Sequence, residues 1–390
     1  MLDKEKDIDA VTISTPDHVH GPAAAFAMQR GKHVYVQKPI THNIREASIL
    51  TELARKQKVV TQMGNQGGSN PLLKMVQNWV DEGKIGKVSE VKVWTNRPVW
   101  PQGVKMQAPD PSLKPDSLDW NLWLGPASQK PYTPNLHPFN WRGWWDYGTG
   151  ALGDMGCHIM GPPFKLLNLG YPTEVSGSAS TTYSGVFKES AFPESGPISS
   201  SLKYRFQQSN GKDLDLYWMD GGITPERLQA LAPEVNMNDA LGDYPGENDF
   251  EGSTLFVGSK GVIACGWGGS HPRLFSKELQ EAASHIPQKY PRVKGGMDGH
   301  WWQWIDASIA GYGNMEVSSP FEGYGGPLTE TVLLGNLLLR SFNIREKVER
   351  IDPVYGKMTG YTYSGRYKAL QWDGASMRVT NYEPANQFVK

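Results

Sequence analysis

The segment VTISTPDHVH occupies residues 11–20 and joins a β-branched, apolar run to a polar turn. The run Val11 to Thr15 has the composition of a buried strand, and Pro16 cannot donate to a ladder of backbone hydrogen bonds. An alanine-rich stretch from Gly21 to Arg30 follows and predicts a helix. A strand that passes directly into a helix is the first half of a β–α–β unit, so this segment predicts a parallel sheet.

The same alternation continues outward from this segment to about residue 95. The expected elements are strands at 33–37, 59–63 and 88–94 and helices at 44–57 and 72–80. Short apolar strands separated by helices are typical of a doubly wound α/β domain. We therefore expect residues 1–95 to form half of such a domain, which binds ligands at the carboxyl ends of its strands.

A second region, residues 96–390, differs in composition and in its expected order of strands and helices. Residues 96–150 are rich in Pro, Trp, Asn and Gly and are expected to be mostly loop. The later part predicts strands without intervening helices, which indicates an open, mainly antiparallel sheet with helices on one face, an α+β arrangement. The expected elements are strands at 174–183, 198–207, 213–218, 254–257, 262–265, 369–372 and 377–380 and helices at 301–310 and 328–340.

Composition excludes several classes of protein. The net charge of −1 gives no basic patch for nucleic acid, so no nucleic-acid partner is expected. No apolar run approaches the roughly 18 residues that span a bilayer, and no membrane association is expected. The charged start MLDKEKDIDA lacks the apolar stretch of a signal peptide, so the chain as written is expected to be cytoplasmic. Cys157 and Cys265 are too few for a disulfide framework.

Seven of the fourteen tryptophans fall between Trp94 and Trp145. Such density in a proline-rich stretch suggests aromatic walls around a ligand. Packing in a core or an interface explains the same residues equally well.

The turn at residues 14–20 is the first candidate site because it follows the carboxyl end of a strand. Thr15 and Pro16 would then face a ligand, although they could also simply end the strand, with Asp17 capping the next helix. A rival interpretation makes His18 and His20 the paired ligands of a metallohydrolase barrel. Pro16 and the helix from Gly21 place both histidines in a turn, so we expect no bound metal.

A second candidate is Gln37-Lys38-Pro39 at the end of the next expected strand. Pro39 stops the ladder, which directs the Lys38 side chain out of the carboxyl edge of the sheet. A lysine in such a crevice can exchange a proton with a hydroxyl group. A solvated lysine at a strand end is the alternative.

The third candidate lies in WRGWWDYGTGALGDMGCH, residues 141–158. It contains a formal G-x-G-x-x-G at residues 148–153, but no apolar strand precedes it and no β–α–β unit follows, so a dinucleotide loop is rejected. A helix that opens near Gly153 would instead place Asp154 and His158 on one face. Pro162 and Pro163 should end or kink this helix.

In order, these pieces resemble the glucose–fructose oxidoreductase/inositol dehydrogenase/rhizopine-catabolism (Gfo/Idh/MocA) family of oxidoreductases. Its pattern is a strand ending in Thr-Pro with a nearby histidine, then Glu-Lys-Pro, then Asp-x-x-x-His at a helix start. The matching residues are Thr15, Pro16 and His20, then Gln37, Lys38 and Pro39, then Asp154 and His158, with Asn65 and Gln66 after a third strand.

The resemblance implies a partial Rossmann-type sheet in residues 1–95 that binds NAD or NADP, and a substrate and oligomerisation domain in residues 96–390. It implies that Lys38 is the catalytic acid or base, that His158 bonds the reacting oxygen and that Asp154 holds a substrate hydroxyl. The residues expected near the nicotinamide are Thr15, Pro16, His20, Gln37, Lys38, Pro39, Asn65 and Gln66. Those expected near a carbohydrate substrate are Trp141, Arg142, Asp154 and His158.

Three departures from the family pattern carry consequences. The family's N-terminal glycine-rich β–α–β unit is absent from residues 1–390, so we expect an N-terminally truncated chain, and a longer precursor could carry an export signal. Gln37 stands where the family has Glu, which removes a carboxylate beside Lys38. Gly161 replaces an acid often found three residues after the histidine.

Three functions remain open on the sequence. The favoured one is an oxidoreductase of a sugar, sugar derivative or cyclitol. The others are a glycosidase that uses NAD for transient oxidation, and a non-catalytic carbohydrate-binding protein that has lost the phosphate loop. The family resemblance also implies a homodimer or homotetramer.

Overall fold

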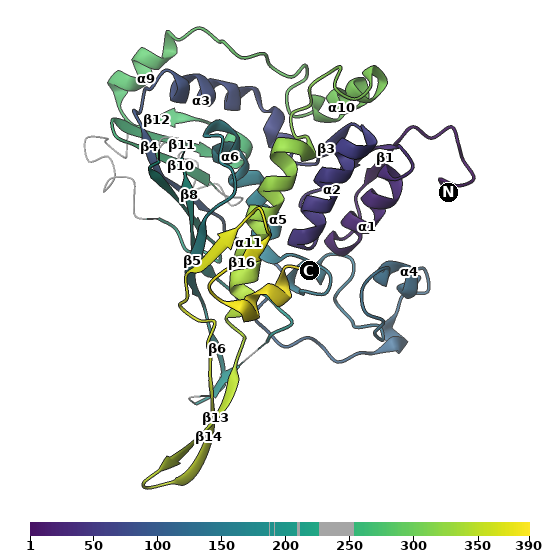
Figure 1. Cartoon of the computed structure of the whole chain (residues 1–390), viewed down its shortest axis with the longest axis vertical. Coiled ribbons are helices and arrows are strands. Elements are labelled where there is room, and N and C mark those ends of the chain that lie inside the picture. Colours follow the sequence, from purple (N-terminus) through teal and green to yellow (C-terminus); the bar gives the residue numbers. More distant parts are fainter. Residues whose placement is uncertain (187, 191, 209–210, 226–252) are drawn as a thin grey trace.

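A computed structural model describes residues 1–390 except 187, 191, 209–210 and 226–252, and its elements gather around two separate β-sheets (Figure 1). Each sheet has helices against it, and the long helix α11 (Gly326–Ser341) runs through the middle of the molecule. The expected fold class, with an α/β part and an α+β part, is therefore confirmed.

The first sheet is parallel and has the order β1-β2-β3. Its strands are β1 (Ala10–Ile13), β2 (His33–Val36) and β3 (Thr61–Met63). The connecting helices are α1 (Asp17–Met28) and α2 (Ile44–Gln57), close to the expected ranges. Because parallel strands end at the same edge, Thr15 and Lys38 are brought to one side of the sheet.

The second sheet is mixed and has the order β12-β11-β10-β4-β9-β8-β5-β15-β16. Its strands are β4 (Val88–Trp94), β5 (Glu174–Ala179), β8 (Ser200–Gln207), β9 (Asp213–Met219), β10 (Ser253–Gly258), β11 (Gly261–Gly266), β12 (Arg273–Leu274), β15 (Leu370–Asp373) and β16 (Arg378–Val379). Every neighbouring pair is antiparallel except β4 and β9, which run parallel.

The assignment of Val88–Trp94 to the parallel sheet was wrong, because β4 pairs with β10 and β9 in the second sheet. The reason is visible in the strand itself. Its valines are buried, whereas Ser89 is exposed and Glu90 and Lys92 are partly exposed. A strand buried on both faces, as in a parallel sheet, would be apolar throughout. The boundary expected near residue 95 stays a prediction, although sheet membership assigns β4 to the second half.

The main core lies between the two sheets and is centred on α11. This helix packs against α2, α5 and β5, and nearly all of its sixteen residues are buried. A helix that is buried on all faces requires neighbours on every side. The other α-helices of the described residues are α3 (Pro71–Asp81), α4 (Trp120–Leu124), α5 (Gly150–Ile159), α6 (Gly161–Leu166), α9 (Lys277–Ser284) and α10 (Gly299–Ala310).

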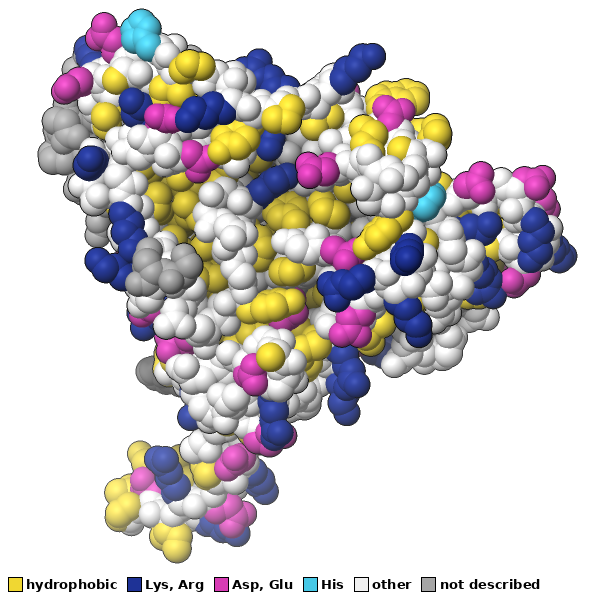
Figure 2. Space-filling model, turned by 45° about the horizontal axis from the view of Figure 1, so that its top comes forward, with side chains coloured by type: hydrophobic (Ala, Val, Ile, Leu, Met, Phe, Trp, Pro, Cys, Tyr) yellow, Lys and Arg dark blue, Asp and Glu magenta, His cyan; other side chains and the backbone are white. Residues whose placement is uncertain are grey.

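A β-hairpin arm projects from this body and was not predicted from the sequence. It consists of β13 (Glu346–Asp352) and β14 (Gly356–Thr362), paired over their full length. Figure 2 shows hydrophobic side chains gathered at its tip, where Ile351, Val354 and Tyr355 are exposed. Two strands alone are marginally stable in water, so the foot of the arm must be held by the body.

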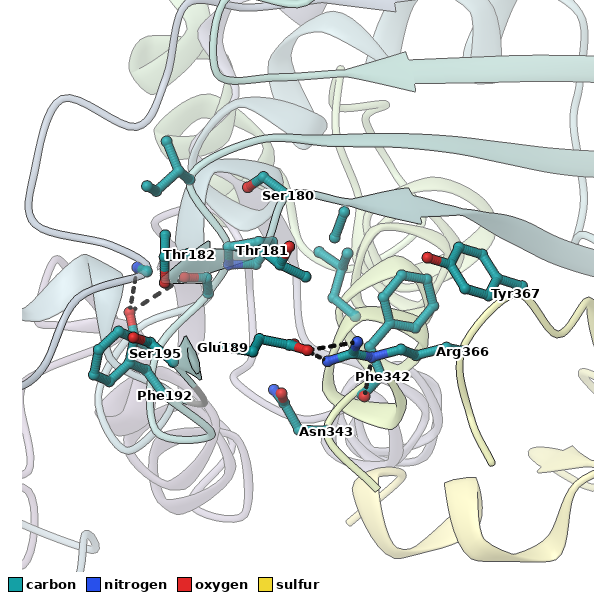
Figure 3. Close-up of a pocket in the computed structure, with 17 residues that line it drawn as sticks. Ser180, Thr181, Thr182, Glu189, Phe192, Ser195, Phe342, Asn343, Arg366 and Tyr367 are labelled. Carbon is teal, nitrogen blue, oxygen red and sulfur yellow. Dashed lines mark hydrogen bonds and ion pairs between the residues drawn. The ribbon is translucent and has the colours of Figure 1, made fainter. Parts of the chain in front are cut away.

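The foot is held beside a second short ribbon, β6 (Thr182–Gly185) with β7 (Lys188–Ser190). Arg366 points at Glu189 there, with 3.2 Å between Nη1 and Oε2, and its Nε donates to the carbonyl of Phe342 (Figure 3). This ion pair is partly buried, so solvent screens it less than an exposed pair.

None of the helices in the described part of the chain has both the length and the apolar character needed to cross a lipid bilayer.

Candidate active site

A cavity of about 450 Å³ opens at the carboxyl ends of β1 and β2. Residues of the parallel-sheet region and of the segment 123–154 form its wall. They are Ser14, Thr15, Pro16, Asp17, His20, Gln37, Lys38, Trp123, His137, Pro138, Trp141, Arg142, Gly150 and Asp154. The cavity therefore lies where the parallel sheet meets α5 and the tryptophan-rich loops.

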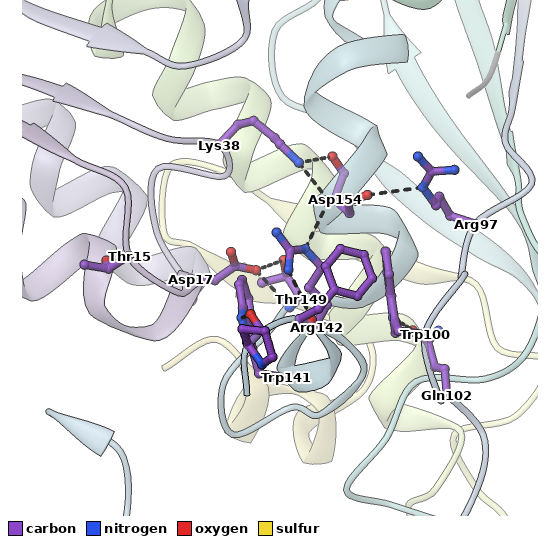
Figure 4. A network of polar contacts seen from close by, with 12 residues as sticks. Thr15, Asp17, Lys38, Arg97, Trp100, Gln102, Trp141, Arg142, Thr149 and Asp154 are labelled. Carbon is purple, nitrogen blue, oxygen red and sulfur yellow. Dashed lines mark hydrogen bonds and ion pairs between the residues drawn. The ribbon is translucent and has the colours of Figure 1, made fainter. Parts of the chain in front are cut away.

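The end of β2 directs Lys38 across the cavity to α5. Its Nζ donates to Asp154 Oδ1 at 2.9 Å and also to the Asp154 backbone carbonyl (Figure 4). The neighbouring turn is tight, because a Cβ on Gly64 would stand 2.5 Å from Gln37 Oε1. Glycine at that position lets the ends of β2 and β3 approach each other.

Asp154 is the centre of a charged cluster. Besides Lys38, the Arg142 guanidinium has its Nε 3.6 Å from Oδ1, and the Arg97 guanidinium has its Nε 3.7 Å from Oδ2. Burial opposes ionisation of the Asp154 carboxyl, but the charge and hydrogen bond of Lys38, with the charge of Arg142, outweigh it and hold its pKa below the usual value.

His158 stands one turn after Asp154 on α5 but faces a separate small pocket beside Asn65 and Cys157. Its ring packs against Trp267 with 4.9 Å between ring centroids. Its buried Nδ1 has no hydrogen-bond partner among the described residues. Burial, assisted by the positive charge of Lys38, lowers the pKa of His158 to about 3, so the ring is neutral at neutral pH.

The residues expected near a nicotinamide divide into two groups. Thr15, Pro16, His20, Gln37 and Lys38 line the cavity. Pro39, Asn65 and Gln66 do not.

Asn65 is buried, donates to the Cys157 carbonyl at 3.3 Å and leaves its Oδ1 without a partner among the described residues. Gln66 donates to the Tyr35 hydroxyl at 3.1 Å. Asn65, after the end of β3, therefore lines the same small pocket as His158.

The His20 ring contacts the backbone after the ends of both β1 and β2. Its Nδ1 lies 2.7 Å from the Pro39 carbonyl and its Nε2 lies 2.8 Å from the Thr15 carbonyl. His18 likewise has both ring nitrogens 3.2 Å from carbonyl oxygens, those of Tyr147 and Trp123. These contacts leave neither ring directed toward a shared metal ion. In the described residues no group of three or more His, Cys, Asp or Glu side chains is arranged to hold one.

The tryptophan-rich loops contribute both to the cavity wall and to an aromatic core. Trp123 and Trp141 line the cavity. Their neighbours form an aromatic core of their own, which includes Trp120, Tyr132, Trp144 and Tyr147. Arg142 lies over the Trp141 ring at 4.3 Å and the Phe139 ring at 4.6 Å, which fixes the plane of its guanidinium.

Helix α5 begins at Gly150, three residues before the expected start, and ends at Ile159, ahead of the prolines of α6. The formal glycine motif at residues 148–153 therefore spans the start of a helix that directly follows a 3₁₀ turn and not a strand.

Sequence reasoning missed two charged residues of the site. Arg97 follows β4, which had been placed in the other sheet. Asp17 was expected at most to cap α1, yet its Oδ2 accepts from the Thr149 backbone N at 3.1 Å and the Thr149 hydroxyl at 2.5 Å. Asp17 therefore joins the start of α1 to the start of α5.

A family described as "Oxidoreductase family, NAD-binding Rossmann fold" matches residues 1–65, and one described as "Oxidoreductase family, C-terminal alpha/beta domain" matches residues 70–180.

The dTDP-3,4-didehydro-2,6-dideoxy-alpha-D-glucose 3-reductase of Actinomadura kijaniata is 30% identical over 73% of this chain and 76% of its own length. The levoglucosan dehydrogenase of Pseudarthrobacter phenanthrenivorans is 24% identical over 40% of this chain and 32% of its own.

Three curated relatives, with that levoglucosan dehydrogenase among them, are matched over only 32%, 27% and 28% of their own lengths. Among solved structures, levoglucosan dehydrogenase in complex with NADH and levoglucosan has a TM-score of 0.49 at 17% identity, over 85% of this chain and 78% of that chain.

Proposed function

Because the chain belongs to the Gfo/Idh/MocA family of oxidoreductases, we propose that it transfers a hydride between NAD or NADP and a hydroxyl or keto carbon of a sugar, sugar derivative or cyclitol. The observation that carries this proposal is the 2.9 Å contact between Lys38 Nζ and Asp154 Oδ1 in the cavity at the strand ends. A cation and an anion held together at the edge of a parallel sheet suit a proton exchange beside a bound cofactor.

The cavity wall fits the nicotinamide end of the cofactor. Thr15, Pro16 and Gln37 come from the ends of two adjacent parallel strands, where doubly wound folds bind this group. In the described residues no glycine-rich turn between a strand and a helix faces the cavity, so we assign no residues to the pyrophosphate. When bound, the nicotinamide would supply the hydride acceptor or donor.

We assign a role to each of three side chains. Lys38 takes the proton from the reacting hydroxyl in oxidation and returns it in reduction. Asp154 orients the Lys38 ammonium and accepts a hydrogen bond from a substrate hydroxyl. His158 is neutral, and its unpartnered Nδ1 gives it the capacity to bond the substrate if the small pocket opens toward the cavity. Trp141 and Arg142, which line the same cavity, would contact the substrate.

Two variants and a control test the assignment. Lys38→Ala and His158→Ala should each lower turnover roughly 10²–10⁴-fold, because each removes a group that exchanges or fixes the reacting proton. Lys87→Ala removes an exposed lysine from a turn outside the cavity and should leave turnover unchanged. Turnover is followed by the absorbance of the reduced nicotinamide with a panel of sugars and cyclitols. Near-wild-type rates in both variants would show that the site is elsewhere.

Cofactor binding is a separate test. NAD and NADP are titrated calorimetrically into this chain and into one extended upstream in the same reading frame. Binding to either protein supports the proposal, and failure of both to bind would remove it. The homodimer or homotetramer, the cytoplasmic location and the N-terminal truncation stay predictions.

A further inference from the structure

The charges around Asp154 do not balance. Its single carboxylate is approached by Lys38 at 2.9 Å, Arg142 at 3.6 Å and Arg97 at 3.7 Å, and all four side chains are between 15% and 28% exposed. Figure 4 shows the three cations converging on Asp154 from different elements. Charges that are partly withdrawn from water interact more strongly than surface charges, so an unbalanced set requires an explanation.

The other acidic residue of the wall does not supply the balance. Asp17 directs Oδ2 at the backbone N and hydroxyl of Thr149, at the start of α5. Even with Asp17 counted, three positive side chains face two negative ones in this part of the described structure. One positive charge therefore remains uncompensated beside the cavity.

Both guanidinium groups keep unused donors. Arg142 donates Nη1 to the Phe139 carbonyl at 3.1 Å, and Arg97 donates Nη1 to Asn96 Oδ1 at 3.0 Å. Within the described residues neither Nη2 has a hydrogen-bond partner. Arg142 also packs on the rings of Trp141 and Phe139, which restrains its guanidinium and preorganises it for a planar acceptor.

We infer that the substrate is an acidic sugar, whose carboxylate is bound by Arg142 and Arg97 while a ring hydroxyl reaches Lys38. This inference rests on the proposed function and adds the substrate class. A carboxylate matches the planar guanidinium fork and supplies the missing negative charge, whereas a neutral sugar does neither. Arg142 and Arg97 are then the residues that determine specificity, and Asp154 holds both in place.

Binding of matched sugar pairs tests this without turnover. Glucuronate is compared with glucose, and galacturonate with galactose, by ligand-observed NMR and calorimetry on the chain. Within a pair the two sugars differ only at the carbon that carries the carboxylate. We expect at least one acid to bind roughly tenfold or more tightly than its neutral partner.

Three variants locate the effect. Arg142→Gln and Arg97→Gln should each reduce the affinity for the acid toward that for the neutral sugar. Arg142→Lys keeps the positive charge but not the planar guanidinium fork, so its affinity for the acid should lie between those of the wild type and Arg142→Gln. The control Arg345→Gln removes an arginine that lies over Tyr361 in the hairpin arm and should keep the full preference. Thermal unfolding verifies that each variant is folded.

The outcomes separate this inference from the proposed function. Three results would overturn the inference. The acid and the neutral sugar could bind equally in both pairs, or neither acid could bind. The third is a preference for the acid that survives both glutamine variants. If a neutral sugar nevertheless reduces the cofactor in a manner that depends on Lys38, the proposed function stands alone. If an acid binds through the arginines but no cofactor is reduced, the acidic-ligand site stands and the oxidoreductase proposal falls.

Discussion

Glu330 gives the fold a pH dependence that can be measured. It lies on α11, is 2% exposed, and accepts a hydrogen bond from Trp372 Nε1 at 3.2 Å. Burial raises the pKa of this carboxyl from its usual value of 4.5 to about 7, and the single bond from Trp372 offsets only part of the effect. In the folded protein Glu330 is therefore protonated over a pH range in which the unfolded chain is ionised.

The direction and size of the effect follow from linkage. Since the folded state holds the proton more tightly, the stabilisation is complete below pH 4.5 and is lost as the pH rises through about 7. The pKa of Glu330 differs between the unfolded chain, 4.5, and the folded protein, about 7. At about 1.4 kcal/mol per pH unit, this difference corresponds to about 3 kcal/mol of unfolding free energy. Glu330→Gln keeps an acceptor for Trp372 and abolishes the titration.

We expect the unfolding free energy of Glu330→Gln minus that of the wild type to increase by about 2–3 kcal/mol between pH 5 and pH 8. Urea unfolding followed by tryptophan fluorescence measures it. Glu281→Gln changes an exposed carboxylate on α9 and should show no comparable trend. A difference that is constant with pH would refute the reasoning, because Glu330 would then be ionised in the folded protein.

Two further substitutions test the packing around α5 and α11. Gly335→Ala places a Cβ 2.0 Å from the Tyr204 hydroxyl oxygen and 2.4 Å from Leu152 Cδ2. It should therefore lower the unfolding free energy, measured in urea, by about 1–3 kcal/mol. The control Gly170→Ala adds a Cβ in open space and should leave the unfolding free energy unchanged. Thr149→Val leaves the buried carboxylate of Asp17 without its hydroxyl partner and should cost about 1–3 kcal/mol in the same assay. An unchanged midpoint for Thr149→Val would mean that the Asp17 contact contributes nothing to stability.

The strand ends and α5 were predictable because their signals are local. Thr15-Pro16 and Lys38-Pro39 each follow a β-branched run, and proline marks where a strand must stop. Parallel pairing then brings both ends to one edge. The spacing from Asp154 to His158 correctly predicted that both residues lie on one helix. Side chains one turn apart nevertheless need not enter the same cavity. Here Asp154 faces Lys38 while His158 packs on Trp267.

The remaining features depend on contacts between distant segments. The partner of β4 is chosen by tertiary packing, although the polar residues that alternate with its valines were a usable signal against the parallel sheet. Arg97 reaches Asp154 only because of that pairing, so no local pattern could assign it to the site. The hairpin arm was missed although Gly356, which ends the turn, has a positive φ. Charged residues lie on both sides of β13, and the two strands bury almost nothing, so no alternation of apolar and polar residues marks them.

The hairpin arm also offers a practical handle on the molecule. It extends away from the parallel sheet and meets the body only around its foot (Figure 1). Exposed hairpin tips tolerate inserted residues well. A biotin-acceptor peptide placed in the turn at residues 353–355 would therefore anchor the chain to a sensor surface. The cavity beside Lys38 would remain open to dissolved ligands.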